Sequence, residues 1–261
     1  MVVDLKYAKQ PSQVYVMLSR AQTLSQIYII DKLFEDNWRV SESAVRELQS
    51  SETNAVNVEN YEDKLMILSL NTSSLRQHFD DVLRLQQQRK FRILCLQETW
   101  LHTTTDPAEY KIDGLQLFLN SVGLGKGLAT YCESDFILDQ NVTNPLCQIS
   151  KITSEKIDVI NAYRSDGSRE FLDELAAIID ENKPTIVCGD TNIDVLTNEG
   201  RELEKLMNDL RFTQLVCKPT HMRGGLIDQV FVSNHLRHQV TVKQEACRHS
   251  DHDILTIIVD I

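Results

Sequence analysis

Between residues 64 and 260 the sequence repeats one pattern, in which short apolar runs alternate with turns and helix-like segments. Such runs, rich in β-branched and aromatic residues and bounded by polar or glycine-containing turns, are typical of β-strands. Eight segments fit this description: 64–71, 91–99, 126–132, 156–164, 184–190, 226–233, 239–246 and 253–260. This pattern restricts the chain to folds built on β-sheets.

Three intervening segments have the periodicity of amphipathic helices: 73–88, 169–182 and 200–212. In the first, Leu75, Phe79 and Val82 share one face, and Ser73 or Ser74 could cap it. Strands covered by helices predict a sheet-based α/β domain. With 261 residues, 42% of them hydrophobic, the chain can form one large core plus an appendage.

The polar stretch 50–63 lacks periodicity and is typical of a linker. We therefore expect an N-terminal segment over residues 1–49, a linker over 50–63 and the main domain over 64–261.

Charge and cysteine content exclude several classes of protein. The net charge of −11 disfavours tight nucleic-acid binding through bulk charge, so a local basic rim or a metal ion would be needed. None of the six cysteines forms a C-x-x-C pair, which predicts a reduced, intracellular protein without a zinc ribbon. No apolar run approaches the ~20 residues of a membrane span, and no signal peptide is visible.

Polar side chains collect at or near the ends of six predicted strands. Catalytic groups commonly occupy such loops, held by a rigid sheet. The residues are Asn71, Glu98, Tyr163, Asp190 with Asn192, Asp228, and Asp251 with His252.

Taken singly, most of these positions have ordinary structural explanations. Asn71 suits a turn, and Tyr163 suits half-buried packing. Asp228 is harder to explain, because a carboxylate among apolar neighbours needs a hydrogen-bonded partner, for which His252 is the candidate. Together, the six positions indicate a functional site.

The ligand types in this set favour one class of metal. Glu98, Asp190 and Asp251 offer hard carboxylate oxygens, and the amides of Asn71 and Asn192 match them. This palette selects Mg²⁺, or Mn²⁺, over Zn²⁺. Such ions usually engage phosphate oxygens, so the set predicts metal-assisted hydrolysis of a phosphate ester.

The order of these residues along the chain resembles the endonuclease/exonuclease/phosphatase superfamily. The series is Asn71, Glu98 in "QET", Tyr163, Asp190 and Asn192 in "GDTN", Asp228 in "LID", and Asp251 and His252 in "SDH". The resemblance spans about residues 61–261 and implies a four-layer sandwich of two mixed β-sheets flanked by helices. In addition, we expect a small N-terminal α/β appendage.

The resemblance also implies a role for each residue of the set. Glu98 would hold the metal with help from Asn71 and Asp251. Asp190 would position or deprotonate the attacking water, and Asn192 would steady the phosphate. Tyr163 would touch a phosphate oxygen, and His252, oriented by Asp228, would bind or protonate at phosphorus.

The stretch "PTH…GGLIDQVFVS" is similar to endonuclease domains of transposable elements. A helicase-like motif in the N-terminal segment, "YVMLSRAQTL", favours DNA as the substrate over other esters, and we expect an intracellular, nuclear location. The candidates for DNA backbone contacts are Lys126, Arg164, Arg223 and Arg248. Two features depart from the family pattern: the domain is short, and Arg164 follows Tyr163 where many members have proline.

The N-terminal motif "YVMLSRAQTL" resembles the last motif of Helitron-type superfamily 1 DNA helicases, with Arg20 in the place of the arginine finger. The chain has no G-x-x-x-x-G-K-[ST] loop, so we expect no ATPase activity. The motif implies a helicase–endonuclease fusion and other helicase segments of a polyprotein as partners.

Two alternatives to a DNA endonuclease stay open at this stage. The first is a phosphatase or phosphodiesterase with the same chemistry that acts on inositol phosphates or phospholipids. The second is a decayed, catalytically inert fragment, which could serve only as a binding module.

Overall fold

The computed structural model describes residues 2–3, 28–29, 63–122, 126–165, 168 and 170–260. The chain divides into two compact units, residues 1–60 and 61–261. In the first unit the described residues form one parallel strand pair, β1 (Val2–Val3) with β2 (Tyr28–Ile29). The helicase-like motif and all of the predicted linker except residue 63 lie outside the described residues.

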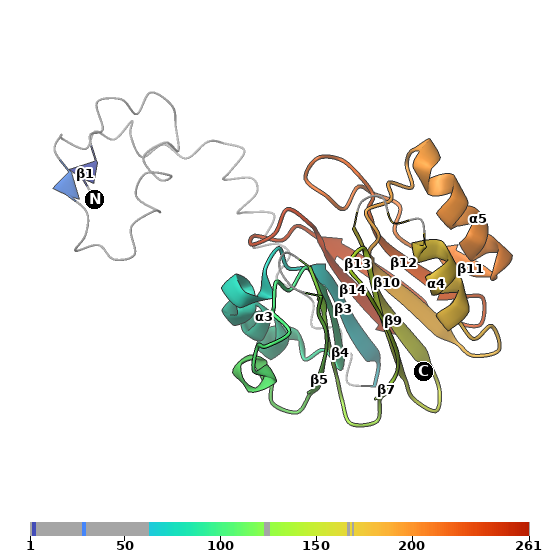
Figure 1. The fold of residues 1–261 in the computed structure, drawn as a ribbon, viewed down its shortest axis with the longest axis horizontal. Coiled ribbons are helices and arrows are strands. Elements are labelled where there is room, and N and C mark those ends of the chain that lie inside the picture. The colour runs from blue at the N-terminus through green and yellow to red at the C-terminus, as the bar shows by residue number, and fades with distance from the viewer. Residues whose placement is uncertain are drawn as a thin grey trace. The chain divides into compact units, whose positions relative to one another are not determined.

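The second unit is built on two mixed six-stranded sheets that pack face to face (Figure 1). One has the order β13-β14-β3-β4-β6-β5 and the other β11-β12-β10-β9-β8-β7. The strands of the first sheet, in that order, are Val240–Glu245, Ile254–Val259, Leu65–Asn71, Ile93–Gln97, Leu128–Cys132 and Gln116–Asn120. Those of the second are Phe212–Gln214, Asp228–Ser233, Thr185–Asp190, Asp158–Arg164, Cys147–Thr153 and Ile137–Asn144.

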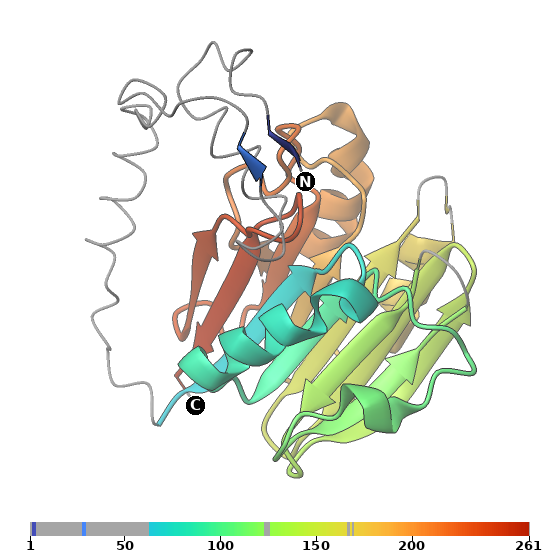
Figure 2. The ribbon, with the colours of Figure 1, turned by 90° about the vertical axis from the view of Figure 1, so that its left-hand side faces the viewer.

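Helices cover the outer faces of both sheets. Helix α3 (Leu75–Arg89) lies on the first sheet, and α4 (Phe171–Ile178) and α5 (Arg201–Asp209) lie on the second (Figures 1 and 2). Two short 3₁₀ helices occupy Pro107–Tyr110 and Asn198–Gly200. The predicted four-layer sandwich of two mixed sheets is therefore confirmed.

The alternation of side chains along each strand produces this layering. In β3, Leu65 and Ile67 point into the core between the sheets, whereas Met66 and Leu68 pack in the core beneath α3. The second sheet follows the same rule, since Val187 packs in the core beneath α4 and α5 and its neighbours face inward. Strands buried on both faces explain why the sequence shows continuous apolar runs.

All eight predicted strands and all three predicted helices are present, with ends shifted by a few residues. The sequence did not predict β5, β7, β8 and β11. Strands β5, β7 and β11 lie at sheet edges, and β7 is largely exposed, so its sequence lacks a strong apolar run. The end of the third predicted helix is wrong, because Phe212 belongs to β11.

Capping of α3 also differs from the prediction. Ser74 occupies the N-cap position, but its side chain makes no capping hydrogen bond. The Ser73 hydroxyl lies instead 3.1 Å from both Asp251 Oδ1 and Ser250 Oγ. The entry to α3 is thus tied to the loop before β14.

Gly189 allows β10 to stay paired with β9 up to its last residue, Asp190. Its φ is +137°, and a Cβ at this position would lie 2.0 Å from the Ala162 carbonyl oxygen on β9. Only glycine can take this conformation so close to a neighbouring backbone. The residue before Asp190 is therefore fixed by sterics.

We expect Gly189→Ala to destabilise the domain by more than about 4 kcal/mol, because the new methyl group overlaps buried backbone. A urea melt measures this. Gly114→Ala is the matched control, since Gly114 also has a positive φ (+84°) but has nothing within 4 Å of an added Cβ. The control should cost about 1–2 kcal/mol. Equal midpoints for the two variants would contradict this explanation.

Candidate active site

The six polar positions predicted from the sequence meet at one end of the sandwich. In the second sheet, Asp190 at the end of β10 pairs with Tyr163 on β9 and with Asp228 on β12. In the first sheet, Asn71 ends β3, and Glu98 directly follows β4, the parallel neighbour of β3. Parallel pairing within each sheet brings these carboxyl ends to the same edge.

A hydrogen bond between the two sheets joins the halves of the site. Asn71 Nδ2 donates to Asp190 Oδ2 at 2.8 Å, and both side chains are fully buried. The other oxygen of Asp190 accepts the backbone N–H of Asn192 at 2.9 Å. Both carboxylate oxygens of Asp190 are therefore held in place.

Asp228 and His252 form a buried carboxylate–imidazole pair. His252 Nδ1 lies 2.9 Å from Asp228 Oδ2, and its Nε2 lies 4.0 Å from Asp190 Oδ2. Burial alone would lower the pKa of His252, but the hydrogen bond and charge of Asp228, with the charges of Asp190 and Asp251, raise it to about 9. The imidazole is thus a cation at neutral pH that faces Asp190.

Asp190 is an acidic side chain that is fully buried, so its charged form has no contact with solvent. Burial and the nearby Asp228 carboxylate raise the pKa of Asp190, and His252 and the two hydrogen bonds only partly offset this. A buried carboxyl group with a raised pKa is suited to accept a proton near neutral pH.

Glu98 and Tyr163 meet across the two sheets. The Tyr163 hydroxyl donates to Glu98 Oε1 at 3.3 Å. Burial first, and then the charges of Glu98 and Asp190, raise the pKa of Tyr163 well above its usual value. Tyr163 therefore stays protonated and can donate a hydrogen bond.

Asp251 is held by residues that the sequence prediction missed. It accepts from the Ser73 hydroxyl at 3.1 Å, and His221 Nε2 lies 3.1 Å from its other oxygen. Burial alone would raise the pKa of Asp251, but its own backbone N–H, the His252 charge, Ser73 and His221 outweigh burial and lower it. The carboxylate is thus ionised and oriented.

His221 contacts the site from a separate loop. It forms an isolated bridge with His252, and the two rings pack edge to face with centroids 4.7 Å apart. The only signal in the sequence was its place in "PTH", shortly before the strand that carries Asp228. Ser73 gave no signal apart from its position two residues after Asn71.

The backbone around the site takes unusual conformations. Ser73, Glu98, Trp100 and Asn192 have φ values of 47°, 48°, 55° and 50°, respectively. Left-handed backbone at residues other than glycine costs free energy and tends to cluster at functional sites. Here it turns the chain sharply at the ends of β3, β4 and β10, so that the side chains converge.

The four predicted basic contacts differ in how they are engaged. The Arg164 guanidinium donates to the carbonyls of Ser168, Thr191 and Asn192, and Asn192 Nδ2 donates back to the Arg164 carbonyl at 2.8 Å. Arg164 therefore braces the loop that carries Asn192. Of the other three, Lys126 donates to the Pro145 carbonyl at 2.6 Å, and Arg223 and Arg248 are exposed.

The donor set fits a hard divalent cation. Glu98 and Asp251 are partly exposed carboxylates at the mouth of the site, and the Asn71 side-chain oxygen accepts from Ser73 N. Two further carboxylates, Asp190 and Asp228, lie behind them with one imidazole. Oxygen ligands in excess over nitrogen ligands suit Mg²⁺ or Mn²⁺.

Comparisons with known proteins find one matching family model and several similar folds. Residues 157–256 match the family model described as "Endonuclease-reverse transcriptase", which covers most of the strands of the second half of the domain. No curated protein matches the chain in sequence.

Three solved structures share the fold. An AP endonuclease from Archaeoglobus fulgidus has a TM-score of 0.62 at 18% identity, covering 76% of this chain and 100% of its own. A Neisseria 3′ phosphatase bound to a product DNA hairpin has a TM-score of 0.63 at 17% identity, with coverages of 76% and 100%. The endonuclease domain of TRAS1, a telomere-specific non-LTR retrotransposon, has a TM-score of 0.62 at 15% identity, with coverages of 75% and 98%. The fold is therefore that of the endonuclease/exonuclease/phosphatase superfamily.

Replacing Asp228 tests the pairing with His252. Because Asp228 is the main group that raises the pKa of His252, we expect Asp228→Asn to lower that pKa from about 9 by about 1–3 units. NMR titration of the imidazole protons measures it, with Asp113→Asn at the surface as the control. An unchanged pKa in Asp228→Asn would contradict the pairing.

Proposed function

We propose that this chain is a metal-dependent phosphodiester hydrolase and that its substrate is DNA. The observation that carries the proposal is the hydrogen bond between Asn71 of one sheet and Asp190 of the other. The same oxygen of Asp190 lies 4.0 Å from Nε2 of His252, whose other ring nitrogen contacts Asp228. A proton acceptor, a buried cation and hard metal ligands are the parts that phosphate-ester hydrolysis requires.

Glu98 would hold a divalent cation, with Asn71 and Asp251 beside it. When bound, such an ion polarises a phosphate oxygen and offsets the negative charge of the reacting group. The acidic groups at this edge of the domain also need such a counter-charge when a phosphate approaches.

The residues of the chain itself would do the rest. Asp190, fixed by Asn71 and Asn192, would orient an attacking water and accept its proton. His252, held by Asp228 with Nε2 toward Asp190, would donate a charged hydrogen bond to a phosphate oxygen. The protonated Tyr163 hydroxyl would donate another, and Asn192 would steady the phosphate.

Several features favour DNA over smaller phosphate esters. Trp100, 45% exposed and two residues from Glu98, can stack on a base, and Met222, 81% exposed, follows His221. The Lys126 carbonyl accepts the backbone N–H of Trp100. Arg223 and Arg248 are close in sequence to His221 and Asp251, and the three basic residues would supply positive charge to an acidic chain. The matching family model and the DNA-bound Neisseria structure point the same way.

We infer further that the domain derives from a transposable element in which it was fused to a helicase. The family model supports a transposon-type endonuclease. The helicase part depends on "YVMLSRAQTL" with Arg20, and it stays a prediction. Three further predictions also stay open to test: that the chain lacks ATPase activity, that helicase segments of a polyprotein are its partners, and that it is located in the nucleus. Among the residues that the structure describes, no helix is long and apolar enough to cross a membrane.

Supercoiled plasmid with Mg²⁺ is the direct test. We expect nicking that a chelator abolishes and that Asp190→Asn slows by about 10²–10⁴-fold, the range for loss of a general base. Asp113→Asn, at a fully exposed position, should keep the rate of the unmodified chain.

Two other outcomes would replace this proposal. Release of phosphate from inositol phosphates or phospholipids without plasmid nicking would select the small-ester alternative. No turnover of any phosphodiester with Mg²⁺ or Mn²⁺ would indicate an inert binding module.

A further inference from the structure

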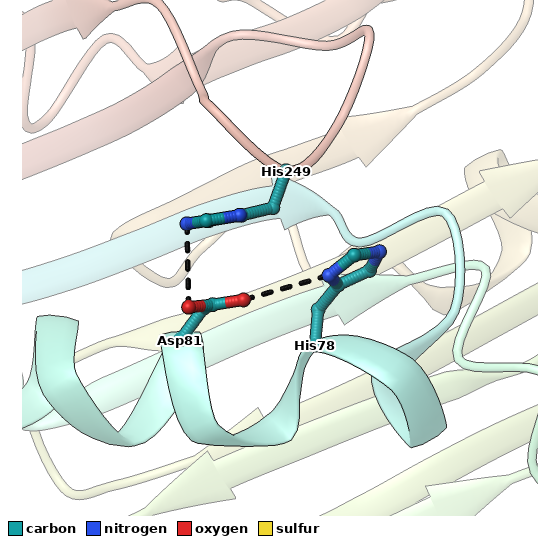
Figure 3. A group of neighbouring side chains, drawn as sticks. All are labelled: His78, Asp81 and His249. Carbon is teal, nitrogen blue, oxygen red and sulfur yellow. Dashed lines mark ion pairs between the residues drawn. The ribbon is translucent and has the colours of Figure 1, made fainter. Parts of the chain in front are cut away.

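A second group of metal-ligating side chains lies outside the proposed active site. His78 and Asp81 belong to α3, and His249 belongs to the loop between β13 and β14 (Figure 3). One candidate ligand atom from each of the three residues lies within 4.8 Å of the other two. The proposed Mg²⁺ chemistry uses none of them.

The spacing suits a shared ion better than direct hydrogen bonds. His78 Nδ1 lies 3.5 Å from Asp81 Oδ2, and His249 Nε2 lies 3.3 Å from Asp81 Oδ1. These distances exceed the about 2.7–3.2 Å of N–H···O hydrogen bonds. The His78 distance, which runs to Asp81 Oδ2, is close to the separation of about 3.3–3.4 Å between two ligands of one tetrahedral zinc ion, given bonds of about 2.0–2.1 Å.

The three side chains also have the right orientation and access. The two imidazole planes are 29° apart, with ring centroids 5.8 Å apart. In Figure 3 each ring has a nitrogen turned toward the Asp81 carboxylate. His249 is 45% exposed, which leaves room for water as a fourth ligand. Arg84 donates to Asp81 Oδ1 at 2.6 Å, so Oδ2 stays available, and a hydrogen bond of this kind orients a metal-binding carboxylate.

The backbone supports the arrangement. His78 has non-helical φ and ψ of −115° and 17°, a kink in α3. Asp81 is three residues further along, so both side chains lie on one face of the helix. On the other side, His249 directly precedes Ser250, which already meets Ser73 at the start of α3.

We propose that His78, Asp81 and His249 bind a divalent transition-metal ion of the zinc class, separate from the oxygen-rich active site. Two imidazoles and one carboxylate form a ligand set that selects such ions over Mg²⁺. The ion would fasten to α3 the loop that carries Asp251 and His252, and would thereby hold those two residues in place.

Cobalt(II) titration of the full-length chain with Mg²⁺ in excess tests this site, because tetrahedral Co²⁺ absorbs visible light. We expect saturable binding with tetrahedral absorption that Zn²⁺ displaces. His249→Gln and His78→Gln should each lose at least about tenfold in Co²⁺ affinity. Two ligand variants keep the test valid if one of them fails to fold, and circular dichroism checks folding.

Two control variants locate the ion. His235→Gln removes an exposed histidine between β12 and β13 and should leave the affinity unchanged. His221→Gln dismantles one of the two other candidate groups among the described residues, that of His221, Asp251 and His252, and binding should survive it. Absence of Co²⁺ binding, binding that persists in both ligand variants, or binding lost in His221→Gln would each overturn the proposal.

Discussion

The hydrogen bond from Asn71 to Asp190 is the interaction on which the site depends. It joins the two sheets through two fully buried polar groups at the edge where β3 and β10 end. A buried carboxylate is tolerated only when hydrogen bonds or opposite charge satisfy it. Asn71, the Asn192 N–H and the cationic His252 meet that need and, in doing so, hold the ends of the two sheets together at Asp190.

The rest of the site follows from packing constraints outside it. Gly189 lets β10 stay beside β9 while the chain turns, which sets Asp190 between Tyr163 and Asp228. Left-handed backbone at Glu98 and Asn192 costs free energy. The buried core between the two sheets, whose strands β4 and β10 lead into these residues, can offset that cost. Asp228 raises the pKa of His252 and thereby keeps a cationic imidazole beside Asp190.

Much of this could be predicted from the sequence. Continuous apolar runs revealed the strands that are buried on both faces, and the polar residues at their ends identified the groups that the fold brings together. The edge strand β7 gave no signal because solvent covers much of it. His221, Ser73 and the brace that Arg164 forms for the Asn192 loop were missed, because their roles depend on loop geometry that no periodicity encodes.

The most direct test of the central claim is the position of a Mn²⁺ ion in crystals of the protein, located by anomalous scattering. We predict an ion bonded to the carboxylate of Glu98, with Asn71 or Asp251 beside it and Asp190 facing it from the other sheet. An ion that avoids Glu98, or no ion at this edge of the sandwich, would contradict the claim that the two sheets together build one metal-dependent active site.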